Sequence, residues 1–349
     1  MPKIIGVMSG SSCDGVDIWL ADAEDCDKSI LAKLVDYPKP LQEKLLAASQ
    51  QELSVSQMFT LEYDYTNFLE KELLPITKAH DVDAIGVHGP TVFHQIKGDV
   101  VASKQLLQAE RLCESLQTRV VSDFRSRDLA ADGQGAPLAP LYHQARFAKH
   151  NKKLAIVNLG GIANISLLGP QGDVIGYDVG PGNAILDTIC QKHFSLPYDK
   201  DGQLAAQGVI DQDVLTHMHA DPFFHKSGPK SVHRDYFNQA WLDSLPVVSN
   251  PHNLLRTVTE LTVELLGPHL VDAHEIFLVG GGANNRFLVE CLQQRCVQPV
   301  WVPEDNDFIE AQLVAWLTVK RILGQKLDYT QVTGAKRPLL YGEVFQPTV

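Results

Sequence analysis

Small and hydroxyl-bearing residues with one carboxylate follow the first apolar segment of the chain. Residues 4–8 lead into Gly10-Ser11-Ser12-Cys13-Asp14-Gly15, and a second apolar segment, residues 16–21, leaves this turn. Small residues let backbone N–H groups approach an anion, so the turn can bind a phosphate. Gly, Ser and Asp are also common in ordinary hairpin turns, which leaves a plain surface turn as the alternative.

Two further glycine-rich segments follow strand-like residues. Asp178 ends one strand and precedes Gly180-Pro181-Gly182 and a predicted helix with Asn183 as its N-cap. The N–H groups of a helix start favour a phosphate oxygen, although an ordinary strand-to-helix loop explains the pattern equally. Residues 280–282, three consecutive glycines, would let an adenine–ribose group lie against the backbone. The chain contains neither a dinucleotide-binding GxGxxG nor a P-loop.

Polar side chains that could contact a small ligand follow two strands of the first half. The planar guanidinium of Arg125 can bind a carboxylate or a pair of hydroxyls. His88 and His94 lie six residues apart across a proline-containing turn, which is poor spacing for metal ligands. A structural or substrate-contacting histidine is therefore favoured over a zinc site. Glu310 starts a predicted helix, where an acid stabilises the helix dipole and could also reach a ligand.

Short buried strands that alternate with helices must position these residues, which predicts an α/β protein. Expected strands cover residues 4–8, 16–21, 84–88, 119–122, 154–159, 164–168, 174–178, 276–279 and 299–302, and expected helices cover 41–49, 58–79, 104–117, 183–193, 286–295 and 309–323. Glycine turns at 9–15 and 160–164 each start a meander of about three strands, as if one architecture were used twice. The expected domains are 1–130 and 131–349, with the last residues returning to the first domain.

Composition excludes several classes of protein. The chain has 349 residues, enough for two domains, with 44% hydrophobic and 21% charged residues and a formal net charge of −12. That charge argues against nucleic acid or an anionic membrane as a partner. Cysteines without a CxxC pair, and no apolar run near ~18 residues, predict a soluble cytoplasmic protein with reduced thiols.

Over essentially its whole length the sequence resembles the anhydro-N-acetylmuramic acid kinase family, a branch of the sugar kinase/Hsp70/actin-like superfamily. Residues 10–17 (GSSCDGVD) are close to the family's GTSLDGVD, and residues 133–138 (GQGAPL) are a specific match. Further matching segments are 88–94, 123–140, 158–166, 177–183, 198–208, 230–238, 280–287 and 310–317.

The resemblance implies two lobes of duplicated ribonuclease-H-like fold, with ATP in the cleft and Mg²⁺ bridging its phosphates. It implies that Asp178 is the general base and that Asp14 organises the magnesium shell through water. The implied ATP-binding residues are Gly10, Ser11, Ser12, Cys13, Asp14, Gly15, Val16, Asp17, Gly160, Gly180, Gly182, Asn183, Gly280, Gly281, Gly282 and Asn284, and the implied substrate residues are His88, Thr91, Arg125 and Glu310.

The family reaction has two parts. A water activated by the base opens the 1,6-anhydro bridge of the sugar, and the freed O6 takes the γ-phosphoryl group, giving N-acetylmuramate 6-phosphate in peptidoglycan recycling. Alternatives are a kinase of another anhydro sugar such as levoglucosan, a hexose kinase, or an actin- or Hsp70-like nucleotide switch. A homodimer is a further expectation at family level.

The chain departs from the family pattern at several positions. Pro90 stands where glutamine is usual, Asp132 replaces a glycine, Cys13 replaces a leucine, and the usual KSTGR is KSVHR at 230–234, with Val232-His233 in its middle. These changes concern the sugar side more than the phosphate chemistry, because Asp14, Asp178 and the glycine turns are kept.

Overall fold

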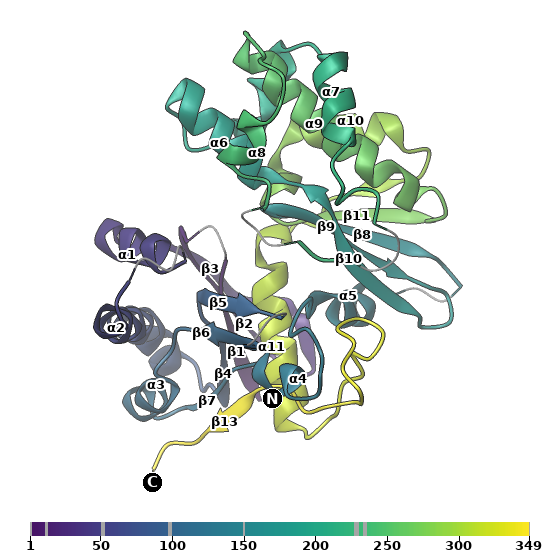
Figure 1. The fold of residues 1–349 in the computed structure, drawn as a ribbon. Helices are drawn as coiled ribbons and strands as arrows, with labels where there is room; N and C mark the ends of the chain where they lie inside the picture. Colours follow the sequence, from purple (N-terminus) through teal and green to yellow (C-terminus); the bar gives the residue numbers. More distant parts are fainter. Residues whose placement is uncertain are drawn as a thin grey trace. The chain divides into compact units, whose positions relative to one another are not determined.

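The chain forms two compact units in the computed structural model. The structure describes residues 2–10, 13–49, 53–96, 100–148, 151–226, 230–232 and 236–348. Unit 1 is Met1–Tyr142 with Phe308–Val349, and unit 2 is His143–Asp307 (Figure 1). The first boundary thus lies after Tyr142 rather than after residue 130, and the whole C-terminal segment from Phe308 belongs to unit 1.

Unit 1 contains a six-stranded sheet in the order β13-β7-β4-β1-β2-β3. Its strands are β1 (Lys3–Ser9), β2 (Gly15–Asp22), β3 (Asp25–Asp36), β4 (Ala84–His88), β7 (Arg119–Ser122) and β13 (Glu343–Phe345). The first three form an antiparallel meander, while β4 runs parallel to β1 and β7 parallel to β4. A separate two-stranded sheet consists of β5 (Thr91–Gln95) and β6 (Ala102–Gln105).

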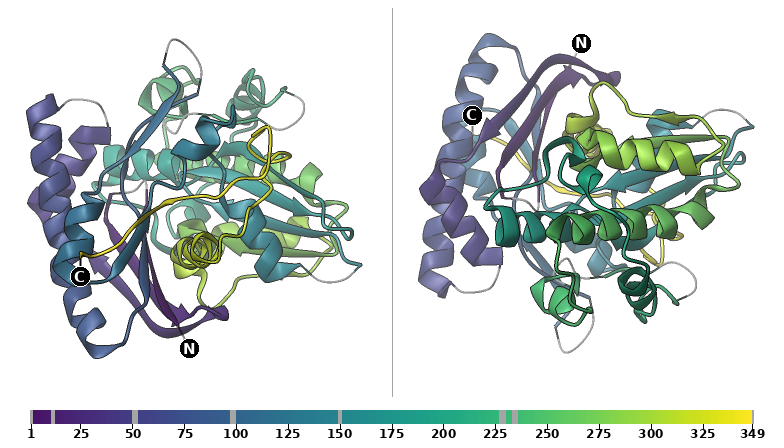
Figure 2. Two further views of the ribbon diagram at one scale, coloured as in Figure 1. Left: turned by 90° about the horizontal axis from the view of Figure 1, so that it is seen from below. Right: turned by 90° about the horizontal axis from the view of Figure 1, so that it is seen from above.

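Helices cover both faces of the unit 1 sheet. Successive residues of a strand point to opposite faces, and the central strands carry apolar residues on both faces. Ile5 and Val7 pack in one core with residues of α1 (Lys39–Ser49), α2 (Val55–Ala79) and α3 (Ala109–Leu116). Ile4 packs on the other face against α11 (Ile309–Ile322). Figure 2 shows α11 and the α1–α3 group on opposite sides of these strands.

Close approach of α11 to the sheet depends on two glycines. A Cβ atom on Gly6 would lie 2.0 Å from the backbone oxygen of Ala311, and one on Gly86 would lie 1.9 Å from Thr318 Oγ1. Any side chain at either position would push the helix away. The start of α11, which carries Glu310, is therefore held at a defined distance from β1 and β4.

Unit 2 repeats the topology of unit 1. Its strands are β8 (Leu154–Leu159), β9 (Ile162–Leu168), β10 (Val174–Pro181), β11 (Glu275–Val279) and β12 (Val300–Trp301), in the order β10-β9-β8-β11-β12. An antiparallel meander is again followed by parallel strands, as in β3-β2-β1-β4-β7. The predicted α/β fold with one ribonuclease-H-like architecture used twice is confirmed.

The long helix α9 (Pro251–Leu270) separates two cores of unit 2. Its Leu266 and Leu270 pack against the sheet, and its Leu255 and Val258 pack with α6 (Asn183–Phe194) and α7 (Gln212–His219). The other helices are α8 (Gln239–Asp243) and α10 (Arg286–Arg295), with short 3-10 turns at Lys200–Gly202, Ala205–Gln207, Gly281–Asn284 and Asn306–Phe308. Within the described residues, no helix is both long and apolar enough to cross a membrane.

A buried carboxylate holds the segment between α4 (Ser126–Leu129) and α5 (Ala139–Phe147) in unit 1. Asp128 is fully buried and accepts hydrogen bonds from Thr333 Oγ1 (2.8 Å), the Tyr341 hydroxyl (2.6 Å) and the Gly135 N–H (2.7 Å). The GQGAPL segment is thus tied to the C-terminal residues. This explains why the boundary of unit 1 lies beyond residue 130.

One predicted element is wrong. Residues 104–117 were expected to form a single helix, but β6 ends at Gln105 and α3 begins at Ala109. Gln105 pairs with Thr91 across the β5–β6 hairpin, and the Leu106 N–H donates to the Pro90 carbonyl at 3.0 Å. These contacts with a distant segment outweigh the local helical periodicity.

Candidate functional site

The carboxyl ends of the parallel strands of unit 1 lie side by side. In the register of β1 and β4, Met8 is opposite His88, and Gly86 of β4 is opposite Val121 of β7. The predicted phosphate turn after β1 and the predicted substrate residues after β4 and β7 therefore share one edge of the sheet. Ligands of open α/β sheets bind at this edge.

The predicted phosphate turn is the hairpin between β1 and β2. Ser11 and Ser12 lie outside the described residues. Cys13 has a left-handed backbone with φ 55°, and its side chain is buried, as is that of Val16. These two residues can therefore face a ligand only through their backbone. Asp14 is exposed, and its carbonyl accepts the Tyr37 N–H at 2.8 Å.

Two more residues of the predicted phosphate segment, Gly15 and Asp17, belong to β2. A Cβ atom on Gly15 would lie 2.4 Å from the Val35 carbonyl oxygen, so β3 requires glycine there. Asp17 is partly buried and lies opposite Met8 in the hairpin. Gly10, at the start of the turn, is partly buried, and its carbonyl accepts the Cys13 N–H at 3.4 Å.

Three buried hydroxyls form a hydrogen-bonded cluster at the end of β1, next to this turn. The Ser9 hydroxyl lies 2.7 Å from the Tyr65 hydroxyl and 2.9 Å from the Tyr37 hydroxyl. Burial raises the pKa of both tyrosines far above neutrality, so both stay protonated and can donate. Nothing in the local sequence pairs these residues, since they come from β1, α2 and the segment after β3.

His88 orients the guanidinium of Arg125. Arg125 Nε donates to His88 Nε2 at 3.0 Å, which places the histidine proton on Nδ1. Burial, with a smaller effect of the neighbouring guanidinium, lowers the pKa of His88 to about 3, so the imidazole is neutral. Burial lowers the pKa of Arg125 to about 10, which leaves it charged. Its two terminal nitrogens have no hydrogen bond to any described residue, so the fork is available to a ligand.

Two further predicted substrate residues are placed in the same unit. Burial raises the pKa of Glu310, and the charge of Arg125 opposes that rise. Thr91 is partly buried at the start of β5, and its hydroxyl accepts from Gln105 Nε2 at 3.1 Å. Gln105, which the sequence did not single out, therefore places an amide beside Thr91, next to Pro90.

Unit 2 brings its three glycine segments together at the carboxyl ends of β8 and β11. The Asn183 N–H donates to the Gly160 carbonyl at 2.8 Å, and its side-chain amide donates to the Leu159 carbonyl at 2.9 Å. A Cβ atom on Gly282 would lie 2.6 Å from the Leu159 side chain. Gly280 has φ 82°, a conformation that favours glycine. The tertiary structure thus makes one backbone-lined surface from segments far apart in sequence.

Details of this surface differ from the sequence-based prediction. The N-cap of α6 is Gly182, not Asn183, and no side chain caps the helix. Gly182 is required for a different reason, because a Cβ atom there would lie 2.3 Å from the Gly160 carbonyl oxygen. Gly281 is the more open position, and the Asn284 amide donates to Asp307 Oδ1 at 2.7 Å.

Asp178 lies at a β-bulge. Its partner in β9 is Asn164, but Gly180 pairs with Ala163, so the register shifts between Asp178 and Gly180. Bulges redirect side chains and are common beside active sites. Burial raises the pKa of Asp178 to about 6, although the Val232 N–H, 2.9 Å from Oδ2, acts in the opposite direction. A carboxylate with this pKa is ionised at neutral pH and can still accept a proton.

The described part of the chain has no group of three or more His, Cys, Asp or Glu residues that could hold a metal ion. An ion that binds through a nucleotide's phosphates, water and one carboxylate such as Asp14 fits this donor set, because Mg²⁺ keeps several waters and uses few protein ligands.

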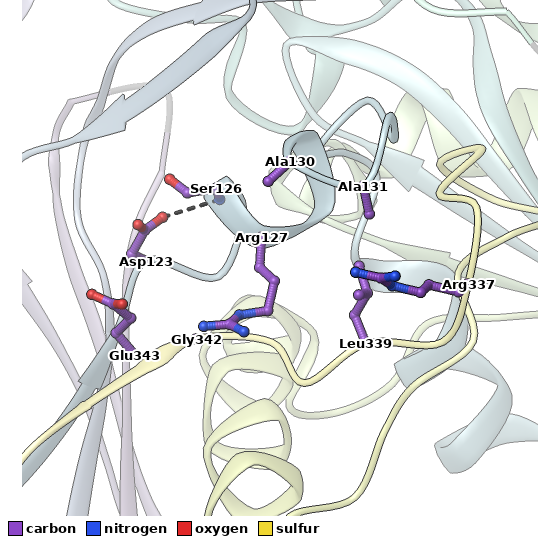
Figure 3. A pocket seen from close by; sticks show the side chains of 9 residues that line it. All are labelled: Asp123, Ser126, Arg127, Ala130, Ala131, Arg337, Leu339, Gly342 and Glu343. Carbon is purple, nitrogen blue, oxygen red and sulfur yellow. Dashed lines mark hydrogen bonds between the residues drawn. The ribbon is translucent and has the colours of Figure 1, made fainter.

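A cavity of about 320 Å³ in unit 1 does not coincide with the predicted site (Figure 3). It lies between α4 and the C-terminal segment. Its lining residues are Asp123, Ser126, Arg127, Ala130, Ala131, Arg337, Leu339, Gly342 and Glu343. None of these is a predicted site residue.

One departure from the family pattern has a structural explanation. Asp132 has φ 63°, a left-handed conformation in which glycine is unstrained and aspartate is among the better tolerated residues. Its carboxylate pairs with Lys336 Nζ at 2.6 Å and is largely exposed. The change is thus accommodated at the surface. His233 lies outside the described residues.

Comparisons with known proteins assign the chain to a family. A family model described as anhydro-N-acetylmuramic acid kinase matches residues 2–347. A Vibrio cholerae protein named anhydro-N-acetylmuramic acid kinase is 38% identical, with 98% of each chain covered. Proteins of that name from Nitrosospira multiformis (38% identical, 98% of each chain) and Sulfurovum sp. (34%, 98% of this chain and 99% of the relative) also match. The chain therefore belongs to the anhydro-N-acetylmuramic acid kinase family.

Proposed function

We propose that this chain uses ATP to convert 1,6-anhydro-N-acetylmuramic acid into N-acetylmuramate 6-phosphate. Family membership over residues 2–347 supports the substrate and the phosphoryl donor. The structural observation that carries the chemistry is Asp178, a bulge-positioned carboxylate beside glycine-lined backbone, with a pKa that burial raises to about 6.

Asp178 acts as the general base for ring opening. Water attacks the anomeric carbon and transfers a proton to the Asp178 carboxylate, while the bond between C1 and O6 breaks and its electron pair stays on O6. O6 then attacks the γ-phosphorus, ADP leaves, and Asp178 returns its proton to solvent. One base suffices, because O6 becomes a nucleophile through the same event that opens the ring.

The remaining proposed residues bind and orient the reactants. Arg125, held through Nε by His88, directs its two terminal nitrogens at the sugar, while Thr91 and Glu310 contact it. The turn at 10–17, together with Gly160, Gly180, Gly182 and Asn183, binds the ATP phosphates, and the segment 280–284 binds the nucleoside. Backbone N–H groups suit this task because phosphoryl transfer needs positioning and neutralisation of charge.

Mg²⁺ is part of the proposal. Asp14 would hold it through water, since the turn exposes this carboxylate and Mg²⁺ is commonly bound by one or two carboxylates with substrate phosphates. When bound, the ion neutralises charge on the ATP phosphates during transfer. Removal of divalent ions with a chelator should abolish turnover, and added Mg²⁺ should restore it.

The direct test is a substrate panel. Purified protein with Mg-ATP is incubated with 1,6-anhydro-N-acetylmuramic acid, levoglucosan or glucose, and sugar 6-phosphate and ADP are measured. We expect product with the first sugar, at a kcat/KM at least tenfold above the others. A reversed preference would assign another sugar, and ADP release independent of sugar would replace the kinase by a nucleotide switch.

Isotope labelling tests the mechanism. In ¹⁸O-water the product should gain one ¹⁸O at the anomeric hydroxyl and none in the phosphate, with preformed product as the control for exchange. Label in released inorganic phosphate would instead indicate ATP hydrolysis. A cytoplasmic location, expected from the composition, and a homodimer, expected from the family resemblance, are also part of the proposal. Sedimentation of the purified protein tests the dimer.

A further inference from the structure

We propose that Lys230 is a positioning residue for Asp178: its ammonium anchors the backbone segment that holds the carboxylate. The inference rests on the proposed function, since it matters for turnover only if Asp178 is the base.

The segment that contains Lys230 holds Asp178 from two sides. The Asp178 N–H donates to the Lys230 carbonyl at 2.9 Å, and the Val232 N–H donates to Asp178 Oδ2 at 2.9 Å. β10 is the edge strand of its sheet, and its register with β9 shifts just after Asp178. Beyond its pairing with β9, Asp178 is therefore held by residues 230–232, which bond both its backbone and its carboxylate.

The Lys230 side chain fastens this segment to the body of unit 2. Its Nζ donates to the Phe223 carbonyl at 3.1 Å and the Phe224 carbonyl at 3.3 Å, and it lies 4.6 Å from the centre of the Phe223 ring. An ammonium group has three N–H donors, so two carbonyls and an aromatic face together form a specific binding site for it.

That binding site is rigid. Phe223 is buried, and Phe224 stacks on Phe237 with ring centroids 5.6 Å apart. Asp221 holds the same turn by accepting from the Phe223 N–H (2.8 Å) and the Trp241 indole N–H (2.9 Å).

The strand that carries Asp178 touches the same aromatic cluster. A Cβ atom on Gly180 would lie 2.6 Å from Leu265 Cδ1 and 3.4 Å from Phe224 Cε1. β10 and the segment 230–232 thus both contact the aromatic cluster around Phe223 and Phe224, and Lys230 is the polar link between segment and cluster. Loss of the ammonium would leave the Phe223 and Phe224 carbonyls without this donor and release residues 230–232. A displacement of about 1 Å at a reacting group can cost about a hundredfold in rate.

Lys230→Met keeps the length of the side chain and removes the ammonium. We expect kcat to fall about tenfold, with KM for ATP and for the sugar changed less than about twofold, because the reacting base moves while the binding groups stay. Lys226→Met is the matched control. Lys226 Nζ lies 5.4 Å from the same Phe223 ring, and among the described residues its side chain has no hydrogen bond to the segment that holds Asp178, so its loss should leave kcat unchanged.

A double-mutant cycle distinguishes positioning from a general structural effect. If Lys230 acts through Asp178, Lys230→Met should reduce kcat of wild type about tenfold and leave the residual kcat of Asp178→Asn unchanged. An equal loss in both backgrounds would overturn the proposal, as would a raised ATP KM with normal kcat, which would place Lys230 on the nucleotide.

The outcome separates the two hypotheses. Full activity of Asp178→Asn would refute the proposed base itself, and the cycle would then show no coupling for that reason. Thermal melting identifies a Lys230→Met protein that does not fold. In that case Lys230→Gln, whose amide keeps two N–H donors but no charge, takes its place in the cycle, and a smaller coupling of the same sign is expected.

Discussion

Replacement of Asp178 by asparagine should reduce turnover and stabilise the protein at the same time. Asparagine keeps an oxygen that can accept the Val232 N–H, but it cannot take a proton from water. Turnover should fall by at least about 10²-fold, the usual contribution of a general base. In the wild type, kcat/KM should decline below the Asp178 pKa of about 6 and reach about one tenth of its plateau near pH 5.

The stability effect follows from the same burial. The pKa of Asp178 is raised from 3.8 to about 6, so the folded state binds more protons than the unfolded state between these values. Stability of the wild type is therefore lost as pH rises through this window, and the loss is complete above pH 6. It amounts to about 3 kcal/mol at pH 8 and about half of that at pH 5.

Thermal melting of wild type and Asp178→Asn at pH 8 and pH 5 checks this. For a unit of this size 1 kcal/mol shifts Tm by about 2–4 °C, so the variant should gain about 6 °C or more at pH 8 and about half as much at pH 5. A variant that is less stable at pH 8, or equally stabilised at both values, would refute the view that Asp178 is a desolvated carboxylate.

Two other sites offer sharp tests. His88→Leu removes the acceptor of Arg125 Nε and should raise the sugar KM about tenfold or more without changing the ATP KM. His88→Gln, which offers an amide oxygen as acceptor, should retain most of the affinity for the sugar. Equal sugar KM values for His88→Leu and wild type would argue against an oriented Arg125. Asp128→Ala leaves the Tyr341 hydroxyl and the Gly135 N–H without their acceptor, while Thr333 Oγ1 keeps the Tyr329 carbonyl at 3.2 Å. The change should destabilise unit 1 by about 3 kcal/mol, against about 1–2 kcal/mol for Tyr341→Phe. Melting curves that match wild type would contradict this account of the GQGAPL segment.

Much of the fold was predictable because its signals are local. Apolar strands followed by glycine turns marked both meanders, and the helix at Arg286–Arg295 was predicted with its observed bounds. The predicted secondary structure was wrong where a contact with a residue distant in the sequence determines the local conformation. The residues before α3 form β6 because Gln105 pairs with Thr91, and Gly182 rather than Asn183 caps α6 because the backbone at Gly160 takes up the Asn183 N–H.

The α/β class, the duplication, the family and the candidate residues could be predicted from residue type and spacing. The protonation state and orientation of those residues depend on the folded protein. Burial sets the pKa of Asp178 and His88, and contacts between distant segments aim Arg125 through His88 and anchor Asp178 through Lys230. Desolvation and long-range hydrogen bonds depend on what surrounds a group in space, which neighbours in the sequence do not specify.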